Sequence, residues 1–259
     1  MGERAETARE RAGAARDAVG ERASAASDAA RGAATDAIDA ASDAIAAVKP
    51  KLRGVSHEWA FFLSLGLGAA LIIAAKTPRA TVAVAIYAVS LSALLGTSAL
   101  YHRVNWKRPN VRRWMRRLDH SMIFFLIAGT YTPFALLVLD GPLADAILAV
   151  VWVGAIAGAV VEMIWIDHPK WVAALIYMSL GWVAVIAFPG LWNEMGVAGT
   201  LLVAAGGLLY TAGAVVYATQ RPDPFPRTFG YHEVFHALVI AAAAAQFAAI
   251  AFFALPAAS

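Results

Sequence analysis

Two histidines four residues apart, His232 and His236, are the residues of this chain best placed to do chemistry. On an α-helix this spacing puts both imidazoles on one face, one turn apart. The apolar run Ala237 to Leu255 follows, and it is long enough to carry the helix across a bilayer. Because ionisable residues are costly inside a membrane and usually mark functional sites, we interpret the pair as part of a metal site.

The same stretch also has the form H-E-x-x-H, in which the glutamate, here Glu233, serves as general base of a zinc protease. After His236 the only polar side chains are Gln246 and Ser259. Any third ligand must therefore come from earlier in the chain. Glu233 stays a candidate base, ranked below the aspartate introduced below.

The composition indicates an integral membrane protein. Of the 259 residues, 60% are hydrophobic and 15% charged, and the mean hydropathy is +0.63, well above a soluble domain. The chain has no cysteine, so a metal would be held by histidine, carboxylate or water. We expect an all-α bundle of seven transmembrane helices, since isolated strands cannot satisfy their backbone in lipid. The predicted spans are Trp59–Ala75, Ala80–His102, Leu118–Leu139, Leu143–Ile166, Trp171–Leu191, Val197–Thr219 and His232–Leu255.

The chain divides by composition into an Ala-rich charged tail, residues 1–48, and the membrane domain, residues 49–259. The tail carries six basic and nine acidic side chains, and we expect it to be helical or disordered and cytoplasmic. The remainder carries fifteen basic and nine acidic side chains. This excess points to membrane topology rather than to nucleic acid.

Basic residues in alternate loops predict the orientation. One side of the membrane would hold thirteen of them, and the other only Lys76 and Arg79. The N-terminus is therefore predicted to be cytoplasmic and the C-terminus outside. The thirteen are Lys49, Lys51, Arg53, Arg103, Lys107, Arg108, Arg112, Arg113, Arg116, Arg117, Lys170, Arg221 and Arg227.

This topology brings polar residues of three spans to one depth near the cytoplasmic face. His102 ends the second span, Asp119 begins the third, and His232 begins the seventh. His102 can join His232 and His236 as a third ligand, because catalytic zinc typically has three protein ligands and one water. Asp119 could hold the metal-bound water or accept its proton. Ser98, one turn before His102, could orient that water or a carbonyl.

Three blocks of the sequence resemble the hemolysin III family, whose relatives include the progestin and adiponectin receptors. The resemblance covers about residues 50–255. The blocks are Gly96-Thr97-Ser98-Ala99-Leu100-Tyr101-His102, then Leu118-Asp119-His120-Ser121 through Gly129-Thr130-Tyr131-Thr132-Pro133, and then Gly230-Tyr231-His232-Glu233 to His236. At the first helix the family often has an Asn and a Thr-His pair, which Ser56-His57 matches only in part, so His57 receives no role.

The resemblance implies a multi-pass protein of the cell membrane that binds Zn²⁺ through His102, His232 and His236. It also implies that Asp119 contacts the metal through water and that Ser98 occupies the family's serine position. The superfamily includes alkaline ceramidases, so the expected function is zinc-dependent hydrolysis of a lipid-like amide, with membrane lipid as partner. Two alternatives stay open: a receptor or lipid sensor with structural zinc, and a pore-forming cytolysin.

Overall fold

The computed structural model describes residue 27 and residues 50–257. Apart from Ser27, the predicted tail 1–48 lies outside the described residues. Within the described part every regular element is a helix, and a single isolated bridge pairs Phe225 with Phe229. The elements are α2 Val55–Ala74, α3 Pro78–Arg103, α4 Pro109–Leu137, α5 Gly141–Ile164, α6 Lys170–Gly181, α7 Ala184–Thr219, α8 Tyr231–Ala249, a π-helical turn Ile250–Ala254 and α9 Leu255–Ala257.

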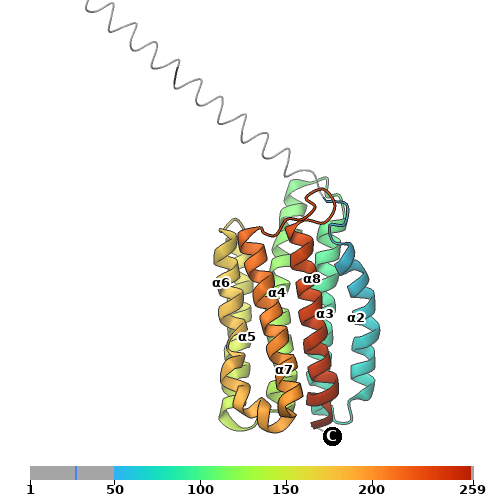
Figure 1. The fold of residues 1–259 in the computed structure, drawn as a ribbon, viewed down its shortest axis with the longest axis vertical. Helices are drawn as coiled ribbons and strands as arrows, with labels where there is room; N and C mark the ends of the chain where they lie inside the picture. The colour runs from blue at the N-terminus through green and yellow to red at the C-terminus, as the bar shows by residue number, and fades with distance from the viewer. Residues whose placement is uncertain (1–26, 28–49, 258–259) are drawn as a thin grey trace, which may run out of the picture. The chain divides into compact units, whose positions relative to one another are not determined.

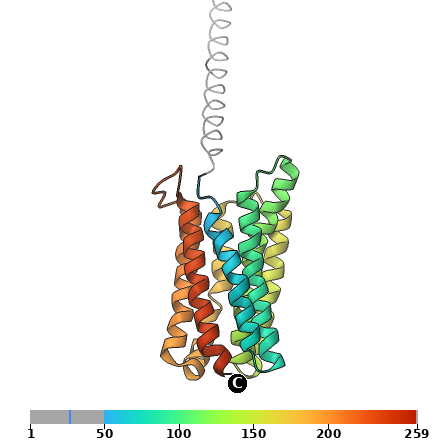
Figure 2. The ribbon, with the colours of Figure 1, turned by 90° about the vertical axis from the view of Figure 1, so that its right-hand side faces the viewer.

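The helices of residues 50–257 form one bundle and run roughly along its length (Figure 1). Neighbours in sequence pack against each other from α2 to α5, α6 packs on α7, and α7 packs on α8. Helix α8 also contacts α2, so these two helices, far apart in the sequence, lie side by side, as Figure 2 shows. This contact brings the histidines at the start of α8 close to the end of α3.

The surface of the bundle is apolar, as expected for helices in lipid. Large hydrophobic side chains such as Phe62, Ile73, Val153 and Phe252 point outward. Six segments of the described chain are long and apolar enough to cross a membrane. The prediction of an all-helical membrane bundle is therefore confirmed for residues 50–257.

The fifth of these segments, Lys170–Thr219, is fifty residues long and interrupted twice. The predicted span Trp171–Leu191 breaks at Trp182 and Val183, between α6 and α7. Within α7 the chain departs from helical geometry at Gly196, where φ is 65° and ψ is −173°. A side chain would strain this positive φ, so glycine suits the position.

At the break between α6 and α7, the side chain of Tyr131 on α4 bonds to the interrupted backbone. The Tyr131 hydroxyl donates to the carbonyl of Gly181 at 2.5 Å and accepts from the N–H of Ala184 at 2.6 Å. A broken helix leaves backbone groups without partners, which is costly in lipid. A tyrosine on a neighbouring helix thus satisfies peptide groups that the interrupted helix cannot.

Candidate metal centre

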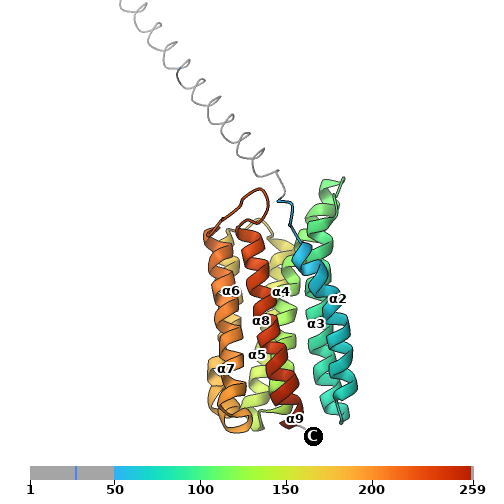
Figure 3. The same cartoon turned by 45° about the vertical axis from the view of Figure 1, so that its right-hand side comes forward.

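The residues predicted to form the site lie at one end of the bundle, on three helices. Ser98 and His102 are in the last two turns of α3, and Asp119 is near the start of the membrane-spanning part of α4. His232 and His236 occupy the first turns of α8, which lies between α2 and α7 in Figure 3.

Helix α8 has a well-defined start that fixes the two histidines. Gly230 precedes the helix, and its N–H donates to Glu233 Oε2 at 2.8 Å. The N–H of Tyr231 donates to Asp223 Oδ1 at 2.8 Å. These carboxylates satisfy donors that the first turn of a helix leaves free.

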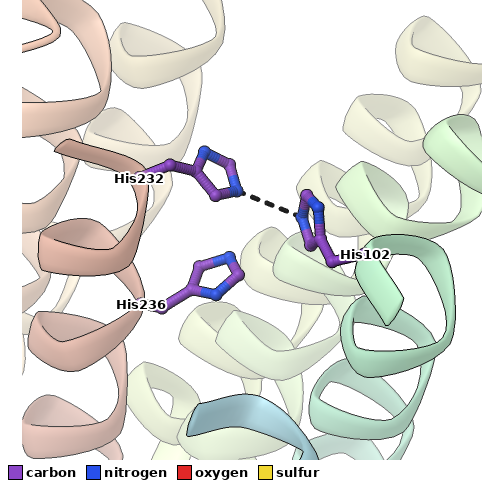
Figure 4. A group of neighbouring side chains, drawn as sticks. All are labelled: His102, His232 and His236. Carbon is purple, nitrogen blue, oxygen red and sulfur yellow. Dashed lines mark hydrogen bonds between the residues drawn. The ribbon is translucent and has the colours of Figure 1, made fainter. Parts of the chain in front are cut away.

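His102, His232 and His236 converge as the spacing and topology predicted. Figure 4 shows His102 facing the other two rings from the opposite helix. The Nε2 atoms of His102 and His232 lie 3.1 Å apart, and each of the three side chains has a nitrogen within 4.8 Å of the others. All three are buried.

This geometry fits a metal ion. Two nitrogens bound to one tetrahedral ion at about 2.0–2.1 Å are separated by roughly 3.3 Å, close to the distance between His102 and His232. In addition, His236 Nδ1 is buried and has no hydrogen-bond partner among the described residues. The cluster can therefore hold a divalent ion. Imidazoles suit several first-row metals, so the donor set does not fix its identity.

Asp119 lies beside the cluster. Its Oδ2 is 3.4 Å from His102 Nε2, the same nitrogen that faces His232. Asp119 and Ser98 both line the cavity described below, together with His232 and His236. The carboxylate and the hydroxyl are thus in reach of a molecule held against the three histidines.

Glu233, the glutamate of the H-E-x-x-H pattern, is engaged elsewhere. One oxygen accepts from the Gly230 N–H, and the other lies 2.5 Å from Arg53 Nε. Glu233 is buried and is not among the residues that line the cavity. Glu233 therefore caps the start of α8 with one oxygen and forms an ion pair with Arg53 through the other.

His57, which the sequence alone leaves without a role, lies beside this cluster. Its ring is parallel to that of His236, with centroids 3.8 Å apart and 9° between the planes. His57 is 2% exposed and lines the cavity, and neither of its ring nitrogens has a hydrogen-bond partner among the described residues. A histidine at the start of an apolar span could have pointed to it, but only tertiary packing brings α2 to α8.

A second polar cluster, also missed, joins α4, α5 and α6 next to Asp119. Glu162 accepts from Tyr177 at 2.9 Å, and its other oxygen lies 3.3 Å from His120 Nδ1. His168 Nε2 is 3.0 Å from Glu162 Oε1. In the sequence, only Glu162 points to this cluster, because a carboxylate in an apolar span needs polar partners on neighbouring helices. His120 and Tyr177 line the cavity as well.

The loop that carries His168 is tied to the basic start of α4. Arg113 and Arg116 both contact Asp167, and Arg116 Nη2 also donates to the carbonyl of Ile166 at 2.9 Å. The Arg113 guanidinium beside Asp167 lowers the pKa of this exposed carboxyl. Part of the predicted basic loop thus pairs within the protein.

A cavity of about 310 Å³ extends from the histidine cluster into the bundle, and apolar side chains form most of its wall. Its lining runs from His236 past Val239 to Gln246 on α8. Trp182 and Leu208 also line it and are 50% and 60% exposed. The cavity therefore reaches the apolar outer surface beside the break between α6 and α7.

The chain is similar to known membrane proteins of one family. A family model described as Haemolysin-III related matches residues 45–247, which include every residue of the site. Hemolysin-3 of Bacillus cereus is 34% identical over 216 residues, covering 79% of this chain and 95% of that protein.

Animal proteins are similar too. The monocyte to macrophage differentiation factor of Homo sapiens is 29% identical over 168 residues, which is 64% of this chain and 67% of that protein. The adiponectin receptor protein of Drosophila melanogaster is 30% identical over 166 residues, which is 58% of this chain but only 37% of the receptor.

Proposed function

Because this chain belongs to the haemolysin-III related family of membrane proteins, we propose that it is a zinc-dependent hydrolase of a lipid-like amide. The observation that carries the proposal is the continuity of the buried histidine cluster with a long apolar cavity. The polar end suits an amide head group and the apolar part suits an acyl chain. A multi-pass position in the cell membrane gives such a substrate direct access.

We further infer seven spans, with the N-terminus cytoplasmic and the C-terminus outside. A straight helix of fifty residues would be about 75 Å long, far more than a hydrocarbon core of about 30 Å. Two crossings with a reversal at Gly196 account for the length of Lys170–Thr219, and the packing of α6 on α7 supports this. The distribution of basic residues supports the orientation.

His102, His232 and His236 would hold the zinc ion. When bound there, zinc supplies a Lewis acid that polarises a carbonyl and lowers the pKa of a water molecule. Neutral imidazole is the form that binds zinc.

Asp119 is the proposed general base, and Ser98 the hydrogen-bond donor that orients the amide carbonyl. Asp119 takes a proton from water, which adds to the carbonyl carbon. The C–N bond then breaks, and the same proton passes to the departing amine, leaving a fatty acid and an amine. Glu233 is a poorer candidate because Arg53 and Gly230 occupy its two oxygens.

The direct test is release of fatty acid from an N-acylated long-chain amine by purified protein in lipid nanodiscs. We expect the zinc-loaded wild type to release fatty acid and the chelator-treated protein to release none. A wild type that holds zinc and binds fatty acid but never releases it would instead support a receptor or lipid sensor with structural zinc. The similarity to an adiponectin receptor protein makes that the second candidate.

A third candidate, membrane lysis, is favoured by the name of the Bacillus cereus relative, Hemolysin-3. Dye release from liposomes tests it. Lysis that is unchanged in His102→Ala would separate lysis from the metal centre.

A further inference from the structure

Two polar groups without partners lie in the cavity wall away from the histidine cluster. Gln246 on α8 is 5% exposed, and its Oε1 has no hydrogen-bond partner among residues 50–257. The hydroxyl of Tyr210 on α7 is also buried and has no partner in that part of the chain. Both residues line the cavity. Their surroundings there are mainly apolar, with neighbours such as Val203 and Val239.

The packing of Gln246 determines which end of its amide is free. The Nε2 atom donates to the carbonyl of Val203 at 3.1 Å. Gly206 lies so close that an added Cβ would be 2.4 Å from this nitrogen. A carbonyl can only accept a hydrogen bond, so the amide nitrogen must face Val203, and Oε1 remains as a fixed acceptor.

Tyr210 also lines the cavity. It lies four residues after Gly206, the residue against which Gln246 packs, and so one turn along the same face of α7. Gln246 lies ten residues after His236, or roughly 15 Å along α8. An acceptor on α8 and a hydroxyl on α7 thus both line the cavity away from the histidine cluster.

Neither the Gln246 oxygen nor the Tyr210 hydroxyl forms a hydrogen bond that links α7 to α8. The link between α7 and α8 uses the Gln246 nitrogen, not its oxygen. Tyr87 differs from Tyr210 in both respects: its hydroxyl donates to the carbonyl of Ala243 at 3.4 Å, and it does not line the cavity. Buried polar groups are normally hydrogen-bonded, and an unpaired one is destabilising.

We propose that Tyr210 and Gln246 form a specificity site for a hydroxyl group carried on the acyl chain of the ligand. A hydroxyl can donate to Gln246 Oε1 and accept from the Tyr210 hydroxyl at the same time. An unsubstituted chain leaves both protein groups unpaired. The inference rests on the proposed function, because it assumes that the chain of a lipid lies in the cavity with its reacting end at the histidines.

The test compares binding of stearic acid with that of its mono-hydroxylated isomers, using full-length protein in nanodiscs and displacement of a fluorescent fatty acid. We expect a mid-chain hydroxyl, about 15 Å from the carboxylate, to increase affinity about ten- to a hundred-fold. A hydroxyl next to the carboxylate should have little effect.

Tyr210→Phe is the decisive variant, because it removes only a hydroxyl that has no hydrogen-bond partner within the described part of the chain. It should still bind stearic acid but lose the preference for the mid-chain isomer, and Gln246→Met should do the same. Tyr87→Phe removes a satisfied hydroxyl outside the cavity and should keep the preference.

Equal binding of all isomers by wild type would overturn the inference and leave the proposed function standing. The same holds if the preference survives in Tyr210→Phe. Failure of wild type to bind any fatty acid would overturn both.

Discussion

The imidazole of His57 is stacked on that of His236, with 3.8 Å between the ring centroids and 9° between the planes. The stacking restricts rotation of the His236 ring. His57 thus supports the histidine cluster from a helix that contributes none of its three members.

His57→Ala should weaken metal binding about ten- to a hundred-fold, which is the usual effect of removing a group that orients a ligand. His57→Phe should retain most of the affinity, because phenylalanine keeps a flat ring against His236. A competition titration with a zinc chelator measures both. Equal losses of metal affinity in the two variants would mean that the His57 nitrogens, rather than the stacking of the rings, support metal binding.

Purified wild type should contain about one zinc ion per chain, since one cluster of three histidines can hold it. His102→Ala should lose it, because a two-ligand site binds far more weakly. Elemental analysis of protein purified without added metal gives the stoichiometry.

His168→Ala is the matched control for this measurement. His168 is also buried, but it contacts Glu162 rather than the cluster. Its removal should leave the zinc content unchanged. A wild type that is folded yet free of metal would contradict the assignment of the site.

Much of the fold and of the histidine cluster was predictable from sequence, for identifiable reasons. The hydropathy of the spans is a local property, and it predicted an all-helical membrane bundle. His232 and His236 share a face through helix periodicity alone. His102 and Asp119 followed from topology, because the ends of successive membrane helices alternate between two surfaces. Helix α3 begins and ends close to the predicted bounds, and α8 begins one residue before the predicted His232, but α4 begins at Pro109, well before the predicted Leu118.

What sequence could not predict depends on packing between distant helices. Nothing local to His57 indicates that α2 lies against α8. The break at Trp182 is equally hidden, since the tyrosine that bonds to the peptide groups there comes from α4. Glu162 signalled a need for partners, but its pairing with His120 and His168 depends on how three helices meet. The cavity beside the histidine cluster has no sequence signature at all.

If Asp119 is the general base, Asp119→Asn should reduce hydrolysis about 10²- to 10⁴-fold while zinc content stays near wild type. Asparagine keeps the shape of the side chain but cannot accept the proton. Glu233→Gln should instead keep most of the activity and lower thermal stability, because it weakens a buried ion pair with Arg53. The reverse pattern would restore the H-E-x-x-H interpretation, with Glu233 as the base.

Arg53→Ala should destabilise the protein by about 3 kcal/mol, because it leaves the buried carboxylate of Glu233 without its cation. Arg103→Ala is a useful comparison: Arg103 pairs with Glu58 at 2.7 Å, but both side chains are exposed. Exposed pairs contribute about 0–1 kcal/mol. Reversible unfolding in mixed micelles should therefore separate the two variants, and equal effects would show that burial of Glu233 does not matter.

Tyr131→Phe should destabilise the protein by about 1–3 kcal/mol, because the Gly181 carbonyl and the Ala184 N–H lose their shared partner. The effect should also reach the cavity, since Tyr131, Gly181 and Ala184 all line it. Tyr231→Phe serves as control, because its hydroxyl bonds only to Lys170 at the end of the bundle. Thermal unfolding in nanodiscs measures stability, and hydrogen exchange of residues 180–186 reports on the break. Unchanged exchange in Tyr131→Phe would mean that the interruption of the helix persists without the tyrosine hydroxyl.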